Sequence, residues 1–233
     1  MSRRSIIFTV VLMFLMVVST GFAADKYQWK LIDKEDGCEL YTSAVAGKDY
    51  IAAKATCVIP ARIEVLGTIL RDIPNYKEWM HDCKDTKMLK TVDDEKDVFI
   101  FWFRQHIDLL TDRDMVLKSK TVIDMHNGTN LVYADSTKEL PYDAGKGYVR
   151  MPSFYSLFTL QWVDREHTRV TFMIDPDLGA GVPSGIANSK IKTTPYKSLK
   201  NMAKMAKKSK YIEASKTSKY NKMAEDYVKS GHK

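Results

Sequence analysis

The chain has few of the residues from which disulfide scaffolds, metal sites and common active sites are built. Its 233 residues include three cysteines and five histidines, and the histidines (81, 106, 126, 167 and 232) show no metal-ligand spacing. No phosphate-binding glycine loop occurs, and Ser184 stands one place too late in residues 181–185 to form a nucleophile elbow. The sequence therefore predicts no metal and no cofactor, and it favours a binding protein over an enzyme.

Long hydrophobic runs are also scarce, and the one that is present lies at the amino terminus. Arg3 and Arg4 precede an apolar run over residues 6–18, and residues 21–23 end in a small side chain. This layout predicts a signal peptide over residues 1–23, cut after Ala23, because the run is short for a bilayer span of about 20 residues. An uncleaved anchor is the alternative. We expect an exported protein, periplasmic in a bacterium, although a eukaryotic secretory signal has the same layout.

Excess positive charge is absent from most of the chain. The net charge is +7, but residues 190–233 carry 13 lysines against three acidic residues, which leaves residues 24–189 net negative. A basic character confined to one end argues against nucleic-acid binding by the core. Two interpretations of the basic end stay open. It is suited to an anionic phospholipid surface, or it is a solvated helix face followed by a lysine-rich tail over 209–233 that forms a frayed helix.

The cysteines are too few for a framework, but two of them have informative positions. Cys38 and Cys57 lie in alternating runs on either side of the turn-like residues 46–49. A hairpin centred on that turn places the two cysteines opposite each other on one face of the sheet. A cross-strand disulfide then becomes available in an oxidising compartment, whereas a register slip of one residue would remove it. Cys83 is interpreted as a free, buried, small hydrophobe.

Hydrophobic periodicity predicts strands and two short helices followed by one long helix. Residues 60–72 begin with a proline and carry an amphipathic helical pattern, and residues 73–82 indicate a turn and a short helical piece. Strand-like runs cover 38–44, 50–58, 84–92, 97–107, 115–124, 129–138, 146–151, 154–164 and 167–175. Asn127 and Gly128 form a strong hairpin signal between two of these runs. Antiparallel strands with segregated helices indicate the α+β class.

Residues 175–188, which we call the hinge, are the most informative segment. The hinge follows two aromatic-rich strand patterns and opens the long carboxy-terminal helix. Gly179 and Gly181 allow positive φ at a sharp reversal, and Pro183 suits the first turn of the helix. We therefore expect the helix to fold back across a curved sheet and to enclose a cavity lined by inward aromatic side chains.

Four segments in a fixed order carry a family likeness. They are residues 75–79 (NYKEW), 111–116 (TDRDMV), 148–150 (YVR) and the hinge. Together they resemble the START domain (steroidogenic-acute-regulatory-protein-related lipid transfer) of the helix-grip superfamily. The predicted domain spans residues 24–208. The chain departs from the family pattern in the length of its hinge and in Pro195, which lies inside the long helix and should kink it.

The resemblance implies a curved antiparallel sheet that grips the carboxy-terminal helix around a hydrophobic tunnel. That tunnel would hold one lipid, such as a sterol, a phospholipid or a ceramide-like molecule, with the helix as its gate, and we expect a monomer. The expected ligand-binding residues are Trp79, Phe99, Phe101, Phe103, Arg104, Tyr133, Phe158, Leu160, Trp162, Phe172, Ile186 and Ile191.

Charged residues in the matching segments have two interpretations. Arg104 could meet a headgroup if its side chain points inward, and it is solvated if the side chain points outward. Asp112, Arg113 and Asp114 are interpreted as ion-paired residues that hold the opening of a strand, and Arg150 as a structural arginine.

Two other functions stay open. Some helix-grip relatives are polyketide cyclases and aromatases, and such an enzyme needs an acid or a base in its pocket. Tyr133, Asp135 and His106 are the strand-borne candidates for that role. The other alternative is a ligand-sensing module whose basic tail binds a partner protein.

Overall fold

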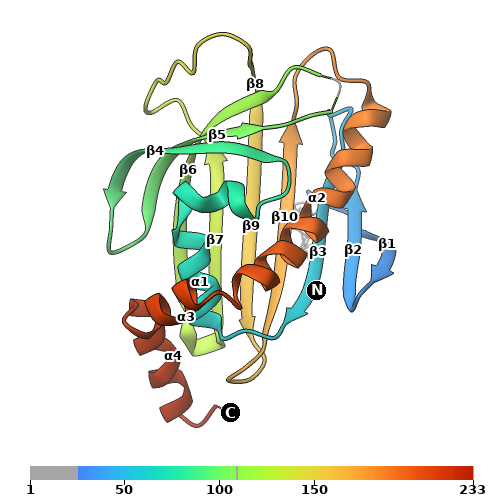
Figure 1. Ribbon diagram of the computed structural model, residues 1–233. Helices are drawn as coiled ribbons and strands as arrows, with labels where there is room; N and C mark the ends of the chain where they lie inside the picture. Colours follow the sequence, from blue (N-terminus) through green and yellow to red (C-terminus); the bar gives the residue numbers. More distant parts are fainter. Residues whose placement is uncertain (1–25, 109, 233) are drawn as a thin grey trace, which may run out of the picture.

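One curved sheet of ten strands forms the body of the molecule, and the computed structural model describes residues 26–108 and 110–232 (Figure 1). The strand order is β1-β2-β3-β10-β9-β7-β6-β5-β4, and β8 pairs with β6 in parallel. The strands are β1 (Lys30–Glu35), β2 (Cys38–Ser43), β3 (Ala52–Ile59), β4 (Cys83–Asp93), β5 (Val98–Gln105), β6 (Arg113–Asp124), β7 (Thr129–Ser136), β8 (Val149–Arg150), β9 (Ser153–Trp162) and β10 (Thr168–Asp177). This is the α+β, helix-grip architecture that the sequence predicts.

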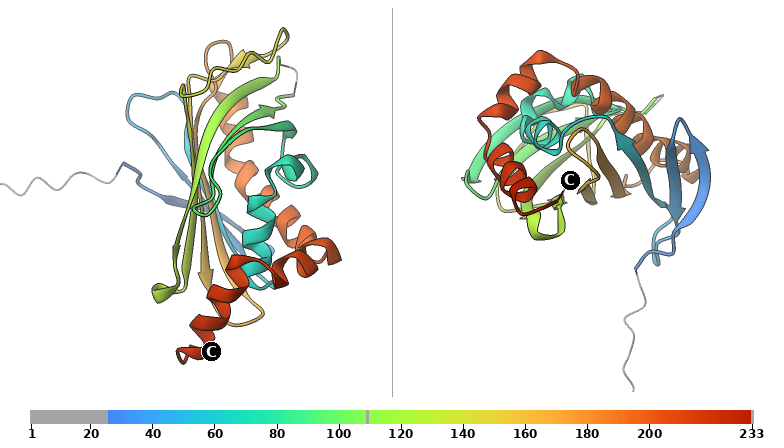
Figure 2. Two further views of the ribbon diagram at one scale, coloured as in Figure 1. Left: turned by 90° about the vertical axis from the view of Figure 1, so that its left-hand side faces the viewer. Right: turned by 90° about the horizontal axis from the view of Figure 1, so that it is seen from below.

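The α-helices all lie on one side of the sheet (Figure 2). They are α1 (Ile63–Arg71), α2 (Ser184–Met205), α3 (Ser209–Lys216) and α4 (Lys219–Lys229), and short 3₁₀ helices occupy η1 (Ile73–Glu78) and η2 (Met125–Asn127). Helix α2 crosses β2, β3 and β10, whereas η1 packs on β4 and α1 reaches β9. Helix α2 therefore covers one side of the concave face, and η1 and α1 cover the other. The middle strands of the sheet lie between these two groups of helices.

Strand β5 is apolar on both faces because both faces are covered. Phe99, Phe101 and Phe103 belong to the main core on the concave side. On the other side lies a second cluster of Ile100, Trp102 and Val116, packed against Leu89, Leu140, Tyr142, Ala144 and Tyr148. Most of these covering residues come from the loop between β7 and β8. This loop explains an apolar run that a one-sided sheet would not need.

The predicted hairpin between β2 and β3 is confirmed, together with its register. Cys38 lies directly opposite Cys57, and the two form a disulfide. The free Cys83 is half-buried. The sequence patterns did not predict β1, because all six of its residues are exposed at the edge of the sheet and carry no alternation of burial.

Residues 209–229 form two helices, α3 and α4, instead of the single frayed helix that the sequence suggested. Both helices pack on α1. Tyr211 and Tyr220 are buried, and the ring of Tyr220 lies so close to Gly67 that a Cβ at this glycine would stand 3.1 Å from it. A Cβ at position 67 would therefore require the ring of Tyr220 to shift. The lysine-rich composition obscured the few aromatic residues that anchor these helices.

The predicted signal peptide, residues 1–23, lies outside the described residues. Within the described part of the chain, no helix combines the length and the apolar character that crossing a membrane requires. Pro195 lies inside α2, which continues through it from Ser184 to Met205.

Candidate ligand-binding site

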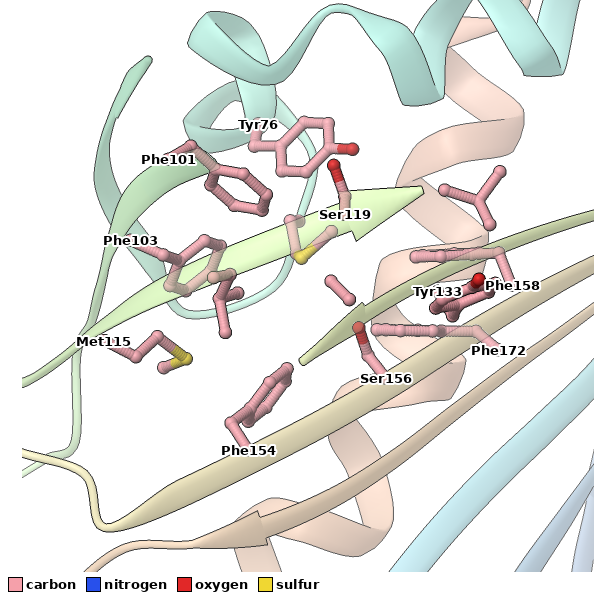
Figure 3. A pocket seen from close by; sticks show the side chains of 14 residues that line it. Tyr76, Phe101, Phe103, Met115, Ser119, Tyr133, Phe154, Ser156, Phe158 and Phe172 are labelled. Atoms are coloured by element: carbon pink, nitrogen blue, oxygen red, sulfur yellow. The ribbon is translucent and has the colours of Figure 1, made fainter. Parts of the chain in front are cut away.

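An apolar cavity lies between the concave face of the sheet and the helices (Figure 3). Its inner chamber contains about 450 Å³ of space not filled by atoms. The lining residues are Tyr76, Met80, Phe101, Phe103, Met115, Leu117, Ser119, Val132, Tyr133, Ala134, Phe154, Ser156, Phe158 and Phe172. No charged side chain is among these described lining residues, so the chamber suits a molecule that leaves water.

A second, outer chamber continues the cavity towards the hinge and α2. The two chambers share Met80, Phe103, Phe154 and Phe172. The outer chamber adds His81, Gln105, Ile107, Ile174, Pro176, Leu178, Lys190, Ile191 and Thr194 to the lining. The lining of the outer chamber is more polar than that of the inner one, because it includes His81, Gln105, Lys190 and Thr194.

A row of small side chains forms the floor of the inner chamber. Ser119 of β6 pairs with Ala134 of β7, which pairs with Ser156 of β9. Side chains of paired residues lie on the same face, and here that face is the concave one. Because the flanking strands contribute phenylalanines, these three short side chains make the room in which a ligand can lie.

Five of the twelve residues predicted to bind ligand have side chains at this cavity, and a sixth lies just behind it. Phe101, Phe103, Phe158 and Phe172 line the inner chamber, and Ile191 of α2 lines the outer one. The rings of Phe158 and Phe172 are stacked 3.9 Å apart. Trp79 packs edge-on against Phe158 just behind the lining.

The side chains of the other six lie outside the cavity, although Tyr133 borders the inner chamber. Phe99 and Leu160 are buried in the core but do not reach the cavity, and Trp162 packs against Tyr227 of α4. Ile186 is 41% exposed on the surface of α2. Tyr133 borders the inner chamber, but alternation along β7 directs its side chain away from the face that carries Val132 and Ala134.

Arg104 lies on the convex face, where it cannot reach a ligand in the cavity. It alternates with the inward Phe103, its Nη2 lies 2.5 Å from Oδ2 of Asp112, and its guanidinium stacks over the ring of Tyr148. The sequence left its direction open, and the structure shows the outward one.

Two charged residues of the matching segments, Asp114 and Arg150, form an ion pair, whereas Arg113 bonds to backbone carbonyl groups. Arg150 of β8 donates two hydrogen bonds to the carboxylate of Asp114, at 2.8 and 2.9 Å, and Trp102 donates a third. Arg113 is buried and donates to the carbonyl oxygens of Leu178 and Ala180 in the hinge. These residues therefore hold the cavity walls together, as the ion-pair interpretation predicted for Asp114.

The hinge is anchored at both ends. Gly179 and Gly181 adopt positive φ, as predicted. Asp175, 1% exposed, accepts hydrogen bonds from Lys26, Lys48 and Tyr27 at 2.6–2.8 Å. Burial alone would raise the pKa of Asp175, but these hydrogen bonds outweigh burial and lower it. At the other end, the amide side chain of Asn188 accepts a hydrogen bond from the backbone of Ile51.

A polar cluster closes the outer chamber between α2 and two loops. Lys190 lies 3.1 Å from Asp82 and 2.9 Å from Asp108. Burial would lower the pKa of Lys190, but its hydrogen bonds to the two carboxylates raise it. Burial also lowers the pKa of the neighbouring His81. Asp108 is largely exposed, so water competes with this contact.

The acid–base candidates do not meet in the cavity. Asp135 is exposed and shares the convex direction of Tyr133, and His106 bonds to Asp112 outside the chambers. Among the described residues, no three His, Cys, Asp or Glu side chains are grouped so that they could hold a metal ion.

Sequence reasoning missed several lining residues, although the signal was available. Ser156 and Phe154 stand two and four places before Phe158, respectively, and therefore share its face. The same rule joins Ser119 to Met115 and Leu117 on β6. Every second residue from a predicted aromatic residue lies on the same sheet face, and following this rule along each strand would have identified the serines of the floor.

Both sequence and fold have relatives. The family model of the START domain matches residues 11–211. An uncharacterized protein of Pseudomonas aeruginosa is 30% identical over 185 residues, which cover 77% of this chain and 87% of that protein.

Solved structures of lipid transfer proteins share the fold. A STAR-related lipid transfer protein from Xanthomonas axonopodis has a TM-score of 0.68 at 23% identity, covering 77% of this chain and 99% of that one. Human STARD10 has a TM-score of 0.69 at 17% identity, covering 80% and 76% of the two chains.

Proposed function

We propose that this chain, which belongs to the START domain family, is a carrier that holds one lipid in the cavity between its sheet and α2. The observation that carries the proposal is the inner chamber, which is apolar and free of charged lining side chains among the described residues. Each methylene group that leaves water for such a site contributes about 0.8 kcal/mol. The lipid-transfer names of the structural neighbours point the same way.

Loading requires the cavity to widen. The centre of a water-sized sphere can move through only about 40 Å³ of the inner chamber and 30 Å³ of the outer one. A lipid needs far more room than that. We propose that α2 moves outward at its amino-terminal half, where polar contacts to Asp82 and Asp108 hold it, and that it acts as the gate.

The basic carboxy-terminal region is suited to an anionic membrane surface. Lys190, Lys200, Lys210, Lys216, Lys219 and Lys229 pair with acidic side chains. Lys192, Lys197, Lys204, Lys207, Lys208 and Lys222 make no ion pair among the described residues and contribute uncompensated charge. The exposed Ile186 adds an apolar contact near the gate. Co-sedimentation with vesicles should therefore require an anionic lipid such as phosphatidylglycerol and should weaken with salt.

Export to an oxidising compartment, the periplasm in a bacterium, is part of the proposal. The amino-terminal signal pattern and the Cys38–Cys57 disulfide support it independently. Amino-terminal sequencing of the exported protein should begin at Ala24, and a chain that retains residues 1–23 would contradict this part.

A carrier is favoured over a cyclase by the position of the acid–base candidates. Asp135 and Tyr133 point away from the chamber, and His106 lies at the outer end of β5. A cyclase needs such a group beside its substrate.

Filling the floor of the chamber tests the carrier. Ala134→Leu adds bulk between Ser119 and Ser156, so it should abolish lipid uptake measured by native mass spectrometry and vesicle-to-vesicle transfer. Ala214→Leu makes the same change at an exposed position of α3 and should leave uptake unchanged. Equal uptake by a folded Ala134→Leu variant, or no uptake by the unaltered chain, would reject the proposal.

A further inference from the structure

Two serine hydroxyls face the inner chamber without a partner. Ser119 is 6% exposed and Ser156 is 8% exposed, and both line the chamber (Figure 3). Neither hydroxyl forms a hydrogen bond with any described residue. Both oxygens remain accessible to the chamber, since neither is among the fully buried atoms without a partner. A ligand that fills the chamber would cut them off from water, and a buried hydroxyl without a hydrogen bond is costly.

Packing does not explain these serines. The residue between them in the row, Ala134, shows that an alanine fits the floor. An alanine at position 119 or 156 would leave the same room without an unsatisfied hydroxyl. Each of the two serines therefore carries a hydroxyl group that the fold does not require.

We propose that Ser119 and Ser156 bind uncharged oxygen atoms of the lipid, such as a hydroxyl or a carbonyl group, inside the inner chamber. This inference rests on the proposed carrier function and narrows its ligand class. The protein then selects a lipid with a neutral oxygen along its apolar body over a plain hydrocarbon. It also rejects a lipid whose charged group must enter the chamber.

The distribution of charge around the cavity supports this class of ligand. No charged side chain lines the inner chamber, so an ionised group there would be buried without a counter-charge. Lys190 is the charged residue of the outer chamber, and it already bonds to Asp82 and Asp108.

The spacing of the serines limits how one ligand meets them. They lie two strands apart, and neighbouring strands are about 4.8 Å apart, so their backbones are separated by about 10 Å. One small oxygen group therefore bonds to one serine at a time. A rigid lipid with an oxygen atom near each end can form a hydrogen bond with both serines.

Matched pairs of probes test the proposal. The chain is incubated with phosphatidylcholine vesicles that contain cholesterol or 5-cholestene, and 1-hexadecanol or hexadecane, each pair differing only in a hydroxyl. Vesicles with palmitate or phosphatidylglycerol form the charged set. Uptake of each probe is measured by native mass spectrometry for the unaltered chain, Ser119→Ala, Ser156→Ala and the double variant. Ser136→Ala, at an exposed position of β7, is the control.

We expect the unaltered chain and Ser136→Ala to prefer the hydroxylated member of at least one pair by about two- to tenfold, the range of one net hydrogen bond. Ser119→Ala or Ser156→Ala should lose that preference without losing uptake of the hydrocarbon. An unchanged preference in the double variant overturns the inference, as does a preference for charged probes, and in both cases the carrier stands. No uptake of any probe by the unaltered chain rejects the carrier itself.

Discussion

Two regions of the molecule are held in place by different forces (Figure 1). Where α1, α3 and α4 pack together, which we call the closed end, Tyr211 and Tyr220 are buried, and Tyr220 packs against Gly67. At the hinge end, α2 is held by Lys190 and its two carboxylate partners, one of which is largely exposed. Water can replace polar contacts of the second kind but not apolar burial. This difference supports the proposal that ligand exchange takes place at the hinge end.

The closed end should respond most strongly to mutation. Tyr220→Ala empties the space above Gly67 and removes the hydrogen bond to Asp97, so it should lower the free energy of unfolding by about 3–5 kcal/mol. Tyr220→Phe keeps the ring and should cost about 1–2 kcal/mol. Denaturant unfolding measures both. If Tyr220→Ala is no worse than Tyr220→Phe, the closed end does not depend on this packing.

The anchor of the hinge should give an intermediate effect that depends on pH. Asp175→Asn weakens three hydrogen bonds to a buried carboxylate and should lower the free energy of unfolding by about 2–3 kcal/mol at pH 7. Because the pKa of Asp175 is lowered in the folded protein, its contribution is complete above the unfolded pKa of about 3.9 and is lost as the pH falls from there through the folded pKa.

Unfolding of both proteins across this pH range checks the sign. The gap between the unaltered chain and Asp175→Asn should be constant above about pH 5 and should narrow in acid. A gap that widens in acid would show that the carboxylate is destabilising when charged.

Release of the gate should speed exchange. Lys190→Met removes the ion pairs to Asp82 and Asp108. It should lower the free energy of unfolding by about 1–3 kcal/mol, because water reaches the exposed Asp108, whereas the side chain of Asp82 is 9% exposed and loses its cation. Lipid transfer between vesicles should become a few times faster, since α2 is released. Lys192→Met, at a lysine without an ion pair among the described residues, should leave the transfer rate unchanged. Equal rates for all three proteins would place the gate elsewhere.

Sequence patterns predicted the fold well because they report burial. The alternating strands, the turn at Gly128 and the disulfide register all follow from the period of two and from turn chemistry. Two regions of the chain were not predicted correctly, and the reason is the same for both. The edge strand β1 buries nothing, and α3 and α4 bury few aromatic residues among many lysines.

The lining of the cavity was predicted less completely than the fold. The sheet face on which a side chain lies, and how deeply it is buried, depend on tertiary packing. Aromatic character pointed to Phe158 and Phe172, but also to Trp162, which α4 covers. The floor consists of small residues, and a serine or an alanine in a strand gives no signal until its face is known. Arg104 shows the same limit, since its direction follows only from the alternation with Phe103.

Arg113 bears on which part of the proposed gate stays still. The residue is 3% exposed, and its guanidinium donates hydrogen bonds to the carbonyl oxygens of Thr111, Leu178 and Ala180. If residues 178–180 moved away, a buried positive charge would lose its acceptors, which is far costlier than breaking a surface ion pair. In the proposed gating motion, these residues would therefore stay in place while α2 moves.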